Sequence, residues 1–367
     1  MLKIGYFVHN LNDPSVERRC SMLTRGGALL AVAGFTRDPQ LRPDIAMRSP
    51  LVVGHTSDAN FIGRIIGAAK VAMFSKELRH HFRDCDVIMA RNLEQLAIAR
   101  VIARGRPIVY ECLDIHRLLV GRSLPAKAVR AAEAALLPHV RLLITSSPAF
   151  LREHFSRRPL SAATLLVENK LLMDGSARFA QPSPPGPPWR IGWFGMLRCH
   201  RTLDFLTDLA AKADGRIEVV ISGKPSPVEL PDFEARVAAS PGLTYTGPYR
   251  YEDLADLYGA VHFAWTIDWF EEGLNSRWLL PNRIYEAIAH RTIPIALAGV
   301  EAGRWLREQG AGLLVQTPDD ARAALLAMDA DHYDMLITPV SQIDSRRVVA
   351  DDRDCREMVA AIGGVAQ

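Results

Sequence analysis

The sequence predicts an α/β protein made of two doubly wound, Rossmann-like domains. Short apolar, β-branched runs alternate with amphipathic runs along nearly the whole chain, which is typical of parallel βαβ units. Residues 181–188, QPSPPGPP, contain five prolines in eight positions and separate two such series. At 367 residues the chain is also too long for one ordinary hydrophobic core. These observations together predict two domains joined by a proline-rich linker.

In the first half, expected strands alternate with expected helices. Asp13-Pro14 begins the first helix, because Asp suits the capping position and Pro the first turn. The expected strands are 3–8, 28–35, 50–54, 86–90, 107–111, 140–145 and 164–167. Further helices are expected at 61–83, 93–103, 126–137 and 148–155. We therefore expect a first domain over 1–180 and a linker over 181–188.

The second half repeats the same alternation. The expected strands are 190–194, 216–221, 243–246, 261–265, 292–297 and 313–315. The expected helices are 203–212, 251–258, 281–290, 302–309 and 319–328. A second domain over 189–344 follows from this pattern, and residues 345–367 remain as a C-terminal segment.

Cysteine usage and hydropathy restrict the class of protein. The five cysteines are odd in number, scattered and without CxxC spacing, which argues against disulfides and a structural zinc site and for a reducing cytoplasm. The first ten residues lack the long apolar run of a signal peptide. No apolar segment approaches the roughly 18–20 residues of a membrane-spanning helix.

The net charge of +3 is unevenly distributed along the chain. Residues 1–176 carry 25 Lys and Arg against 15 Asp and Glu, and residues 177–367 carry 19 against 26. The basic half indicates an anionic surface or substrate. Nucleic acid is disfavoured because the sequence has no recognised binding motif and few aromatic residues.

The segment 280–299 is the most informative stretch. Pro281 suits a first helical turn, Ile284 and Ile288 share an apolar stripe, and 292–297 is a buried strand. NRIYEA followed by TIPIA resembles the nucleotide-sugar signature of GT-B glycosyltransferases. The resemblance implies that Glu286, one turn after Arg283, binds the donor ribose, whose diol can donate two hydrogen bonds to a carboxylate. A solvent-facing Glu on an ordinary helix is the alternative.

The opening of the second domain resembles the family's diphosphate-binding turn. Gly195 lies in WFGMLR, and Arg198 and Arg201 follow it before a helix. A glycine permits close approach of the backbone to phosphate, a helix N-terminus offers N–H donors, and arginine offers a bidentate cation. The resemblance also places Gly223 and Lys224 near the diphosphate. An ordinary βα turn with surface arginines is the alternative.

Two loops resemble family segments around the base and the sugar. Tyr249, in TGPYR, is the candidate for stacking on uracil, and a loop aromatic at a strand end is the alternative. Retaining members carry Glu-x7-Glu, but Trp278 stands eight residues before Glu286, so the pattern is broken. This departure puts a retaining mechanism in doubt. The acids that could replace the missing Glu are Asp268, Glu271 and Glu272.

The first domain contains VYECLDIH at 109–116, which resembles a strand of bacterial exopolysaccharide glycosyltransferases, including the succinoglycan-biosynthesis type. An inverting transferase needs a base that takes the proton from the acceptor hydroxyl. Asp114 is the first choice and His116 the second, with helix capping as the alternative for Asp114. His9 and Asn10, after the first strand, are expected at the acceptor cleft.

Two other motifs each have more than one interpretation. Asp84-Cys-Asp86 is a formal DxD, which we interpret as coincidental, because it precedes a strand in a basic domain. The resemblance implies metal-independent donor binding. We therefore expect no metal and no cofactor besides the UDP-sugar co-substrate. The segment 61–83 has five Lys or Arg, one acid and large apolar residues, which suits an anionic membrane surface. A core-packed helix with a solvated basic edge is the alternative.

Taken together, the resemblance implies a GT-B fold whose two domains face a cleft and whose last helix crosses back to the first domain. It implies a cytoplasmic hexosyltransferase, peripheral at the inner face of the cytoplasmic membrane. The expected reaction moves a sugar, with glucose from UDP-glucose as the first choice, onto a polyprenyl-diphosphate-linked saccharide. A GT-B sugar-nucleotide epimerase and a catalytically degenerate subunit that binds a partner transferase remain alternatives.

Overall fold

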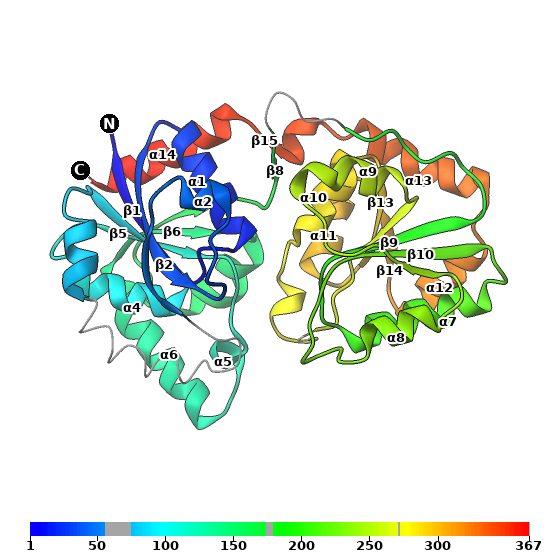
Figure 1. Cartoon of the computed structure of the whole chain (residues 1–367), viewed down its shortest axis with the longest axis horizontal. Coiled ribbons are helices and arrows are strands. Elements are labelled where there is room, and N and C mark those ends of the chain that lie inside the picture. The colour runs from blue at the N-terminus through cyan, green and yellow to red at the C-terminus, as the bar shows by residue number, and fades with distance from the viewer. Residues whose placement is uncertain (56–74, 174–178, 271, 367) are drawn as a thin grey trace. The chain divides into compact units, whose positions relative to one another are not determined.

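The chain divides into two compact units (Figure 1). The computed structural model describes residues 1–55, 75–173, 179–270 and 272–366. Unit 1 comprises Met1–Glu168 and Asp351–Gln367, and unit 2 comprises Asn169–Ala350. Both termini lie on unit 1 (Figure 1). Among the described residues, no helix has the length and apolar character needed to span a membrane.

Unit 1 is built on a seven-stranded parallel sheet with the order β3-β2-β1-β4-β5-β6-β7. Its strands are β1 (Lys3–Val8), β2 (Leu29–Thr36), β3 (Leu51–His55), β4 (Val87–Arg91), β5 (Ile108–Cys112), β6 (Val140–Thr145) and β7 (Ala163–Leu166). Its α-helices are α1 (Pro14–Arg25), α2 (Pro43–Ala46), α4 (Leu93–Ile102), α5 (Arg117–Val120), α6 (Leu124–Leu136) and α14 (Asp352–Ala366). Every residue of β4 and β5 is buried, as expected of parallel strands covered on both faces.

Unit 2 has a six-stranded parallel sheet with the order β11-β10-β9-β12-β13-β14. Its strands are β9 (Trp189–Leu197), β10 (Ile217–Pro225), β11 (Leu243–Tyr245), β12 (Phe263–Trp265), β13 (Ile293–Leu297) and β14 (Leu313–Val315). Two short strands, β8 (Leu171–Leu172) and β15 (Val349–Ala350), pair separately. The helices are α7 (His200–Lys212), α8 (Phe233–Ala238), α9 (Leu254–Gly259), α10 (Asn282–Ala289), α11 (Glu301–Glu308), α12 (Pro318–Leu326) and α13 (Ala330–Gln342).

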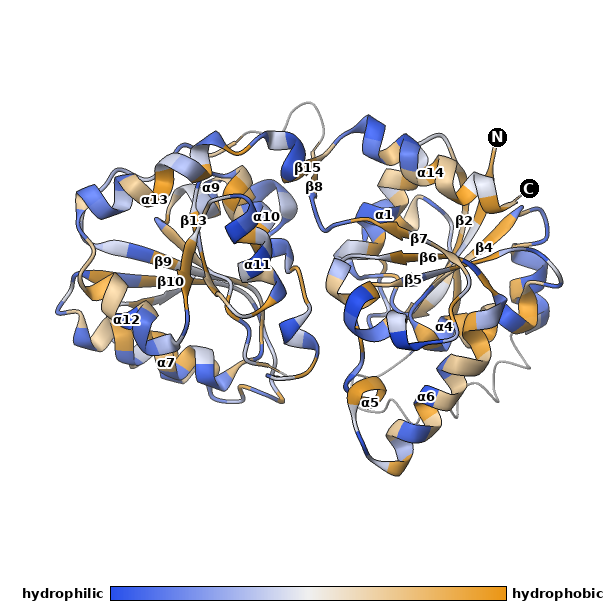
Figure 2. Cartoon of the chain, turned by 180° about the vertical axis from the view of Figure 1, so that it is seen from behind, coloured by the Kyte–Doolittle hydropathy of each residue, from blue (hydrophilic) through white to orange (hydrophobic). Residues whose placement is uncertain are grey.

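Each unit has its own hydrophobic core, and the most hydrophobic residues concentrate in the central strands (Figure 2). The strand order reverses between β1 and β4 in unit 1 and between β9 and β12 in unit 2. In open parallel sheets, ligands bind outside the carboxyl ends of the strands at such a reversal. The carboxyl edges at these two reversals are therefore the expected locations of the functional residues.

The predicted linker is wrong, because the proline-rich stretch 181–188 belongs to unit 2 and the boundary between the units falls after Glu168. Ser183 is buried, its hydroxyl donates to the Gly259 carbonyl at 2.9 Å, and Tyr333 donates to the Ser183 carbonyl at 3.1 Å. Prolines exclude the stretch from helix and sheet, but these side-chain contacts still fasten it to the unit.

Several helix assignments also differ from the sequence prediction, which did not include the short helices α2, α5 and α8. Residues 148–155 contain a π-helical turn, Phe150–His154, in place of an α-helix. The helix α13 was not predicted, and it tolerates Pro339 near its C-terminal end. The last helix begins at Asp352 and not at Ser345, because Ser345–Arg347 is a short 3-10 turn and β15 follows it.

Candidate functional site

Two glycines bring β9 and β10 unusually close at their carboxyl ends. Gly195 has φ +105° and Gly223 has φ +142°, both in the region that favours glycine. The two residues are register partners, and a Cβ on Gly223 would lie 1.8 Å from the Gly195 carbonyl oxygen. Any side chain at Gly223 would therefore separate the strands. The predicted glycines thus lie near the carboxyl ends of β9 and β10, and β9 leads into α7, whose N-terminus can attract an anion.

Glu286, the predicted ribose ligand, lies on α10 and is only 8% exposed. Its Oε2 accepts a hydrogen bond from the Tyr258 hydroxyl at 2.8 Å, and Tyr258 is fully buried on α9. Tyr258 in turn stacks on His290, with ring centroids 5.8 Å apart. Burial lowers the pKa of His290 to about 4, so the ring is neutral at physiological pH. The carboxylate of Glu286 is therefore fixed by a buried tyrosine that sequence reasoning did not identify.

Tyr249, predicted to stack on uracil, lies beside the same carboxylate. Burial, with the negative charge of Glu286 nearby, raises the pKa of its phenol well above the usual value. Its hydroxyl lies 3.9 Å from the position a Cβ would take on Gly195, and its ring meets the edge of Phe194. Gly195, Tyr249 and Glu286 are thus grouped at the carboxyl edge of unit 2.

Two of the predicted cations converge on Asp268, which follows β12. Arg198 Nη2 lies 4.0 Å and Arg283 Nη2 lies 3.9 Å from Asp268 Oδ2. Arg198 also stacks over the Phe270 ring at 4.3 Å, and Arg283 donates to the Trp265 carbonyl at 3.3 Å. The structure therefore groups one carboxylate and two guanidinium groups where the strand order reverses.

The remaining predicted residues of unit 2 are more exposed. Arg201 pairs with Glu272 and stacks over the Trp269 ring at 4.5 Å. Lys224 is exposed near the end of β10. Glu271 lies outside the described residues. Arg201 lies in the first turn of α7, and because its pair with Glu272 is exposed, an anion can replace that carboxylate.

In unit 1, the predicted bases follow β5. Asp114 is exposed in the loop after the strand. His116 caps α5, because its Nδ1 accepts a hydrogen bond from the Leu118 backbone N–H at 3.2 Å. His116, and not Asp114, is the N-cap residue of α5, and the exposure of Asp114 leaves it accessible to a substrate hydroxyl.

His9 and Asn10 lie where β1 ends, beside the reversal between β1 and β4. His9 Nε2 is 3.4 Å from Asp13 Oδ2, and Asp13 caps α1 by accepting from the Ser15 backbone N–H at 2.9 Å. Burial alone raises the pKa of Asp13, but its hydrogen bond to His9 and the Arg91 charge outweigh burial and hold that pKa well below its usual range. Asn10 accepts from the Asn12 backbone N–H at 3.2 Å and shapes the turn.

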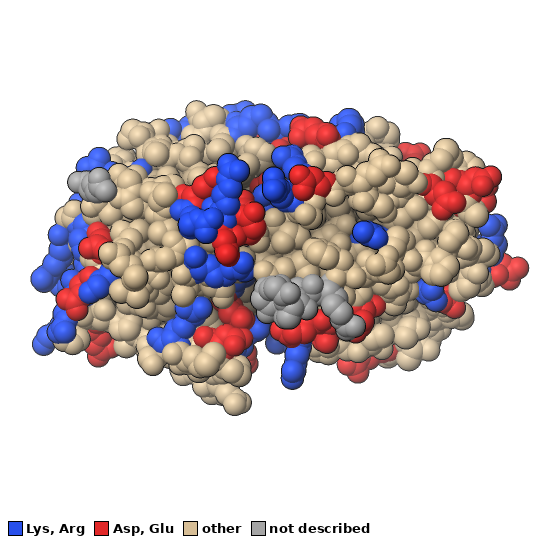
Figure 3. All heavy atoms as spheres, turned by 90° about the horizontal axis from the view of Figure 1, so that it is seen from above, with Lys and Arg blue, Asp and Glu red and all other residues tan. Residues whose placement is uncertain are grey.

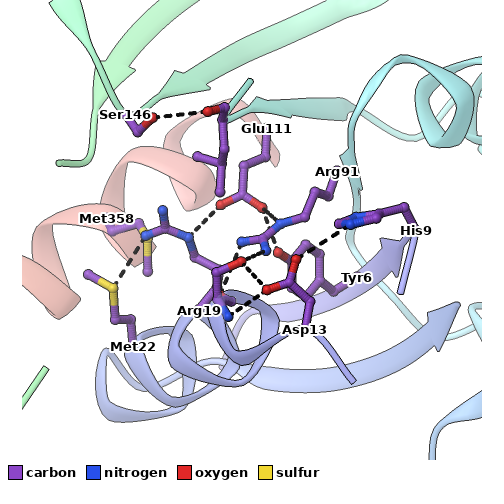
Figure 4. Close-up of polar contacts among 11 residues, drawn as sticks. Tyr6, His9, Asp13, Arg19, Met22, Arg91, Glu111, Ser146 and Met358 are labelled. Atoms are coloured by element: carbon purple, nitrogen blue, oxygen red, sulfur yellow. Dashed lines mark hydrogen bonds and ion pairs between the residues drawn. The ribbon is translucent and has the colours of Figure 1, made fainter. Parts of the chain in front are cut away.

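Next to the His9–Asp13 pair lies an ion cluster centred on Glu111, a residue for which no role was predicted from the sequence (Figure 4). Arg19 from α1 and Arg91 from β4 point toward the Glu111 carboxylate, and the Tyr6 hydroxyl donates to it as well (Figure 4). The Arg91 Nε to Glu111 Oε2 distance is 2.7 Å, and Glu111 is 0% exposed. Burial raises the pKa of Glu111, but Arg91 and Arg19 outweigh it and lower the pKa to about 2.

The cluster continues in two directions. Arg91 Nη1 donates to the Ser15 hydroxyl at 2.7 Å, and that hydroxyl donates to Asp13. Arg19 Nη1 contacts the sulfur of Met358 on α14 at 3.3 Å, which joins the C-terminal helix to unit 1. A charged residue in a wholly apolar strand requires a partner, so β5 itself contained the information that Glu111 is paired. Which arginines pair with it was not apparent from the sequence.

The basic character of the first half is not gathered into a patch on the face drawn in Figure 3, where cationic and anionic side chains are interspersed. Arg25, for example, pairs with Asp352 at 2.6 Å. Residues 61–74 of the segment expected to meet a membrane lie outside the described residues. In its described part Lys76 is exposed, while Leu78 and Phe82 are buried.

Comparison with known proteins identifies the fold and the family. No family model matches the sequence. The succinoglycan biosynthesis protein ExoL of Rhizobium meliloti (strain 1021) is 43% identical over an alignment of 375 positions. The alignment covers 98% of this chain and 93% of that protein. Among solved structures, Anabaena HepE in complex with UDP-glucose matches with a TM-score of 0.70 at 14% identity, covering 99% of this chain and 100% of HepE.

A second solved structure is the apo form of the lipopolysaccharide outer core galactosyltransferase WaaB, with a TM-score of 0.66 at 14% identity and 99% coverage of both chains. At such low identities these likenesses show the fold, which is GT-B, whereas the likeness to ExoL shows the family. The chain therefore belongs to the family of the succinoglycan biosynthesis protein ExoL and has the fold of the GT-B glycosyltransferases.

Proposed function

We propose that this GT-B glycosyltransferase transfers glucose from UDP-glucose to a polyprenyl-diphosphate-linked saccharide during exopolysaccharide assembly. The observation that carries the proposal is the grouping of Glu286, Tyr249, Gly195 and two arginines at the carboxyl edge of unit 2. The succinoglycan role named for ExoL and the UDP-glucose bound to HepE support the pathway and the donor.

In unit 2 each group would meet a different part of the donor. Glu286, oriented by Tyr258, accepts hydrogen bonds from the ribose hydroxyls. Tyr249 lies against the nucleobase. Arg198, Arg201 and the α7 N-terminus neutralise the diphosphate, and therefore no metal ion is required to hold it. As the bond from the anomeric carbon to UDP breaks, these same groups stabilise the charge on the leaving group.

In unit 1 the acceptor hydroxyl is activated. Asp114 takes the hydroxyl proton while the hydroxyl oxygen attacks the anomeric carbon, so a single displacement inverts the configuration. The exposure of Asp114 after β5 supports this role, and His116 on the same loop is the second choice. His9 and Asn10, at the strand-order reversal, bind the saccharide of the acceptor.

A lipid-linked acceptor would place the enzyme at the inner face of the cytoplasmic membrane. The excess of Lys and Arg in residues 1–176 supports contact of unit 1 with anionic lipids. Such contact would concentrate the enzyme where its acceptor is embedded.

The test is a transfer assay with purified protein, UDP-glucose and lipid-linked saccharide extracted from membranes of a mutant that lacks this enzyme. We expect transfer of glucose that persists in EDTA, a product of inverted anomeric configuration by NMR, and a loss of about 100- to 10,000-fold in kcat for Asp114→Asn. UDP binding by this variant should be unchanged. Conversion of the UDP-sugar without acceptor, or nucleotide binding without any turnover, would contradict the proposal and favour the epimerase or the degenerate subunit respectively.

A further inference from the structure

Asp268 lies between two arginines of the donor site without contacting either closely. Its Oδ2 is 4.0 Å from Arg198 and 3.9 Å from Arg283, whereas charge-assisted hydrogen bonds measure about 2.7–2.9 Å. Its other oxygen, Oδ1, accepts a hydrogen bond from the Phe270 backbone N–H at 2.9 Å. The side chain is 20% exposed, so the space beside it is open to solvent.

The two arginines are held in place by other groups. Arg198 stacks over the Phe270 ring at 4.3 Å, and Arg283 donates to the Trp265 carbonyl at 3.3 Å. Removing the charge of Asp268 would therefore leave both guanidinium groups where they are. The three side chains carry two positive charges and one negative charge, and this excess attracts an anion.

We propose that Asp268 is an internal counter-ion of the donor site. Its carboxylate occupies the position between Arg198 and Arg283 that the donor's diphosphate takes when the nucleotide binds. The proposal rests on the proposed function, because it assigns the diphosphate to this site. When the diphosphate enters, its oxygens contact the two guanidinium groups directly and the weak attraction to Asp268 is replaced.

Such a counter-ion makes the site selective for charge. A diphosphate brings more negative charge than the single carboxylate with which it competes, so the exchange is favourable. Neutral uridine gains nothing from the arginines, and its binding is independent of Asp268. Competition from Asp268 also weakens the hold on UDP after transfer, which promotes product release. In this role Asp268 acts on the phosphate end of the donor and does not bind the sugar.

The test compares the wild-type protein with Asp268→Asn by calorimetric titration of UDP, UDP-glucose and uridine. We expect the variant to bind UDP and UDP-glucose about five- to tenfold more tightly, the scale of two partly exposed ion pairs. Uridine affinity should be unchanged, and the difference for UDP should shrink as salt is raised from 50 to 500 mM.

Asp329→Asn is the matched control, because it removes the same charge from unit 2. Asp329 caps α13, a role that Asn fills equally well. It follows Met328, whose carbonyl accepts from the Trp189 indole at the start of β9, so it lies at the opposite edge of the sheet from Asp268. This variant should bind UDP like the wild type, and far-UV circular dichroism should confirm that both variants are folded.

The outcomes separate the inference from the proposed function. Unchanged or weaker UDP binding by Asp268→Asn, with UDP binding still dependent on Glu286, would overturn the counter-ion and leave the proposed function standing. Weaker binding of UDP-glucose alone would overturn it as well, because Asp268 would then be a sugar ligand. A wild-type protein that binds no UDP would overturn both.

Discussion

Each unit contains a carboxylate between two arginines at the carboxyl edge of its sheet, yet the two clusters differ in burial and in the distances between their charged atoms. Glu111 in unit 1 is 0% exposed and lies 2.7 Å from Arg91. Asp268 in unit 2 is 20% exposed and lies 3.9–4.0 Å from its arginines. The same three charges form short, buried ion pairs in unit 1 and long, partly exposed ion pairs in unit 2.

Burial determines whether such an ion cluster can bind a ligand. In unit 1 the charges are removed from water, and the short contacts offset the desolvation cost, so no capacity is left for a ligand. In unit 2 the contacts are long and partly exposed, so each is worth little and is easily exchanged for a better anion. We infer that the cluster of unit 1 is structural and that the cluster of unit 2 binds the donor.

The largest expected effect is a loss of stability when the buried ion cluster around Glu111 is broken. Glu111→Gln leaves Arg19 and Arg91 buried without a carboxylate, which should lower the free energy of unfolding by about 3–5 kcal/mol. Asp268→Asn should change it by less than about 1 kcal/mol, since its pairs are partly exposed. All six tryptophans lie in unit 2, so urea unfolding followed by circular dichroism reports both units, and tryptophan fluorescence reports unit 2 alone.

We expect Glu111→Gln to shift the circular dichroism transition and to leave the fluorescence transition in place. If Glu111→Gln and Asp268→Asn lowered the free energy of unfolding by equal and small amounts, the two clusters would not differ in the way described.

The second effect is the pH dependence that Glu111 gives to the stability of unit 1. The pKa of Glu111 is lowered from an ordinary 4.5 to about 2, so the unfolded chain binds the proton more readily than the folded chain. This contribution is fully present above about pH 5 and is lost as the pH falls toward 2, with a magnitude on the order of 3 kcal/mol. Urea midpoints at pH 6 and pH 3 should differ more in the wild type than in Glu111→Gln. An identical pH response in both proteins would contradict the assignment.

Much of the fold could be predicted because strand–helix alternation is written locally in the sequence. Glu286 could be placed on a helix before a buried strand for the same reason. The ion clusters could not be predicted, because Arg19 and Glu111 are 92 positions apart and no local pattern pairs them. Tyr258 escaped notice likewise, since it is 28 positions from Glu286. The linker prediction was wrong because composition does not reveal that Ser183 is hydrogen-bonded to the rest of unit 2.

The smallest expected effect concerns the orientation of the donor ligand within unit 2. Tyr258→Phe removes the hydroxyl that holds Glu286 at 2.8 Å, so UDP binding should weaken by about 1 kcal/mol, or roughly fivefold. Tyr333→Phe is the matched control, because its hydroxyl bonds the Ser183 carbonyl at 3.1 Å and serves the fold alone. Calorimetry in which the two variants bind UDP equally well would argue against a positioning role for Tyr258.

The proposed function requires that the loosely paired charges of unit 2 surround a nucleotide-sugar site whose ribose ligand is Glu286. Calorimetric titration of UDP, UDP-glucose and GDP-mannose into the wild type and Glu286→Ala tests it most directly. We expect the wild type to bind UDP and UDP-glucose in preference to GDP-mannose, and the variant to bind UDP more weakly by about 1–3 kcal/mol. Absence of nucleotide binding, or binding that is indifferent to Glu286, would contradict it.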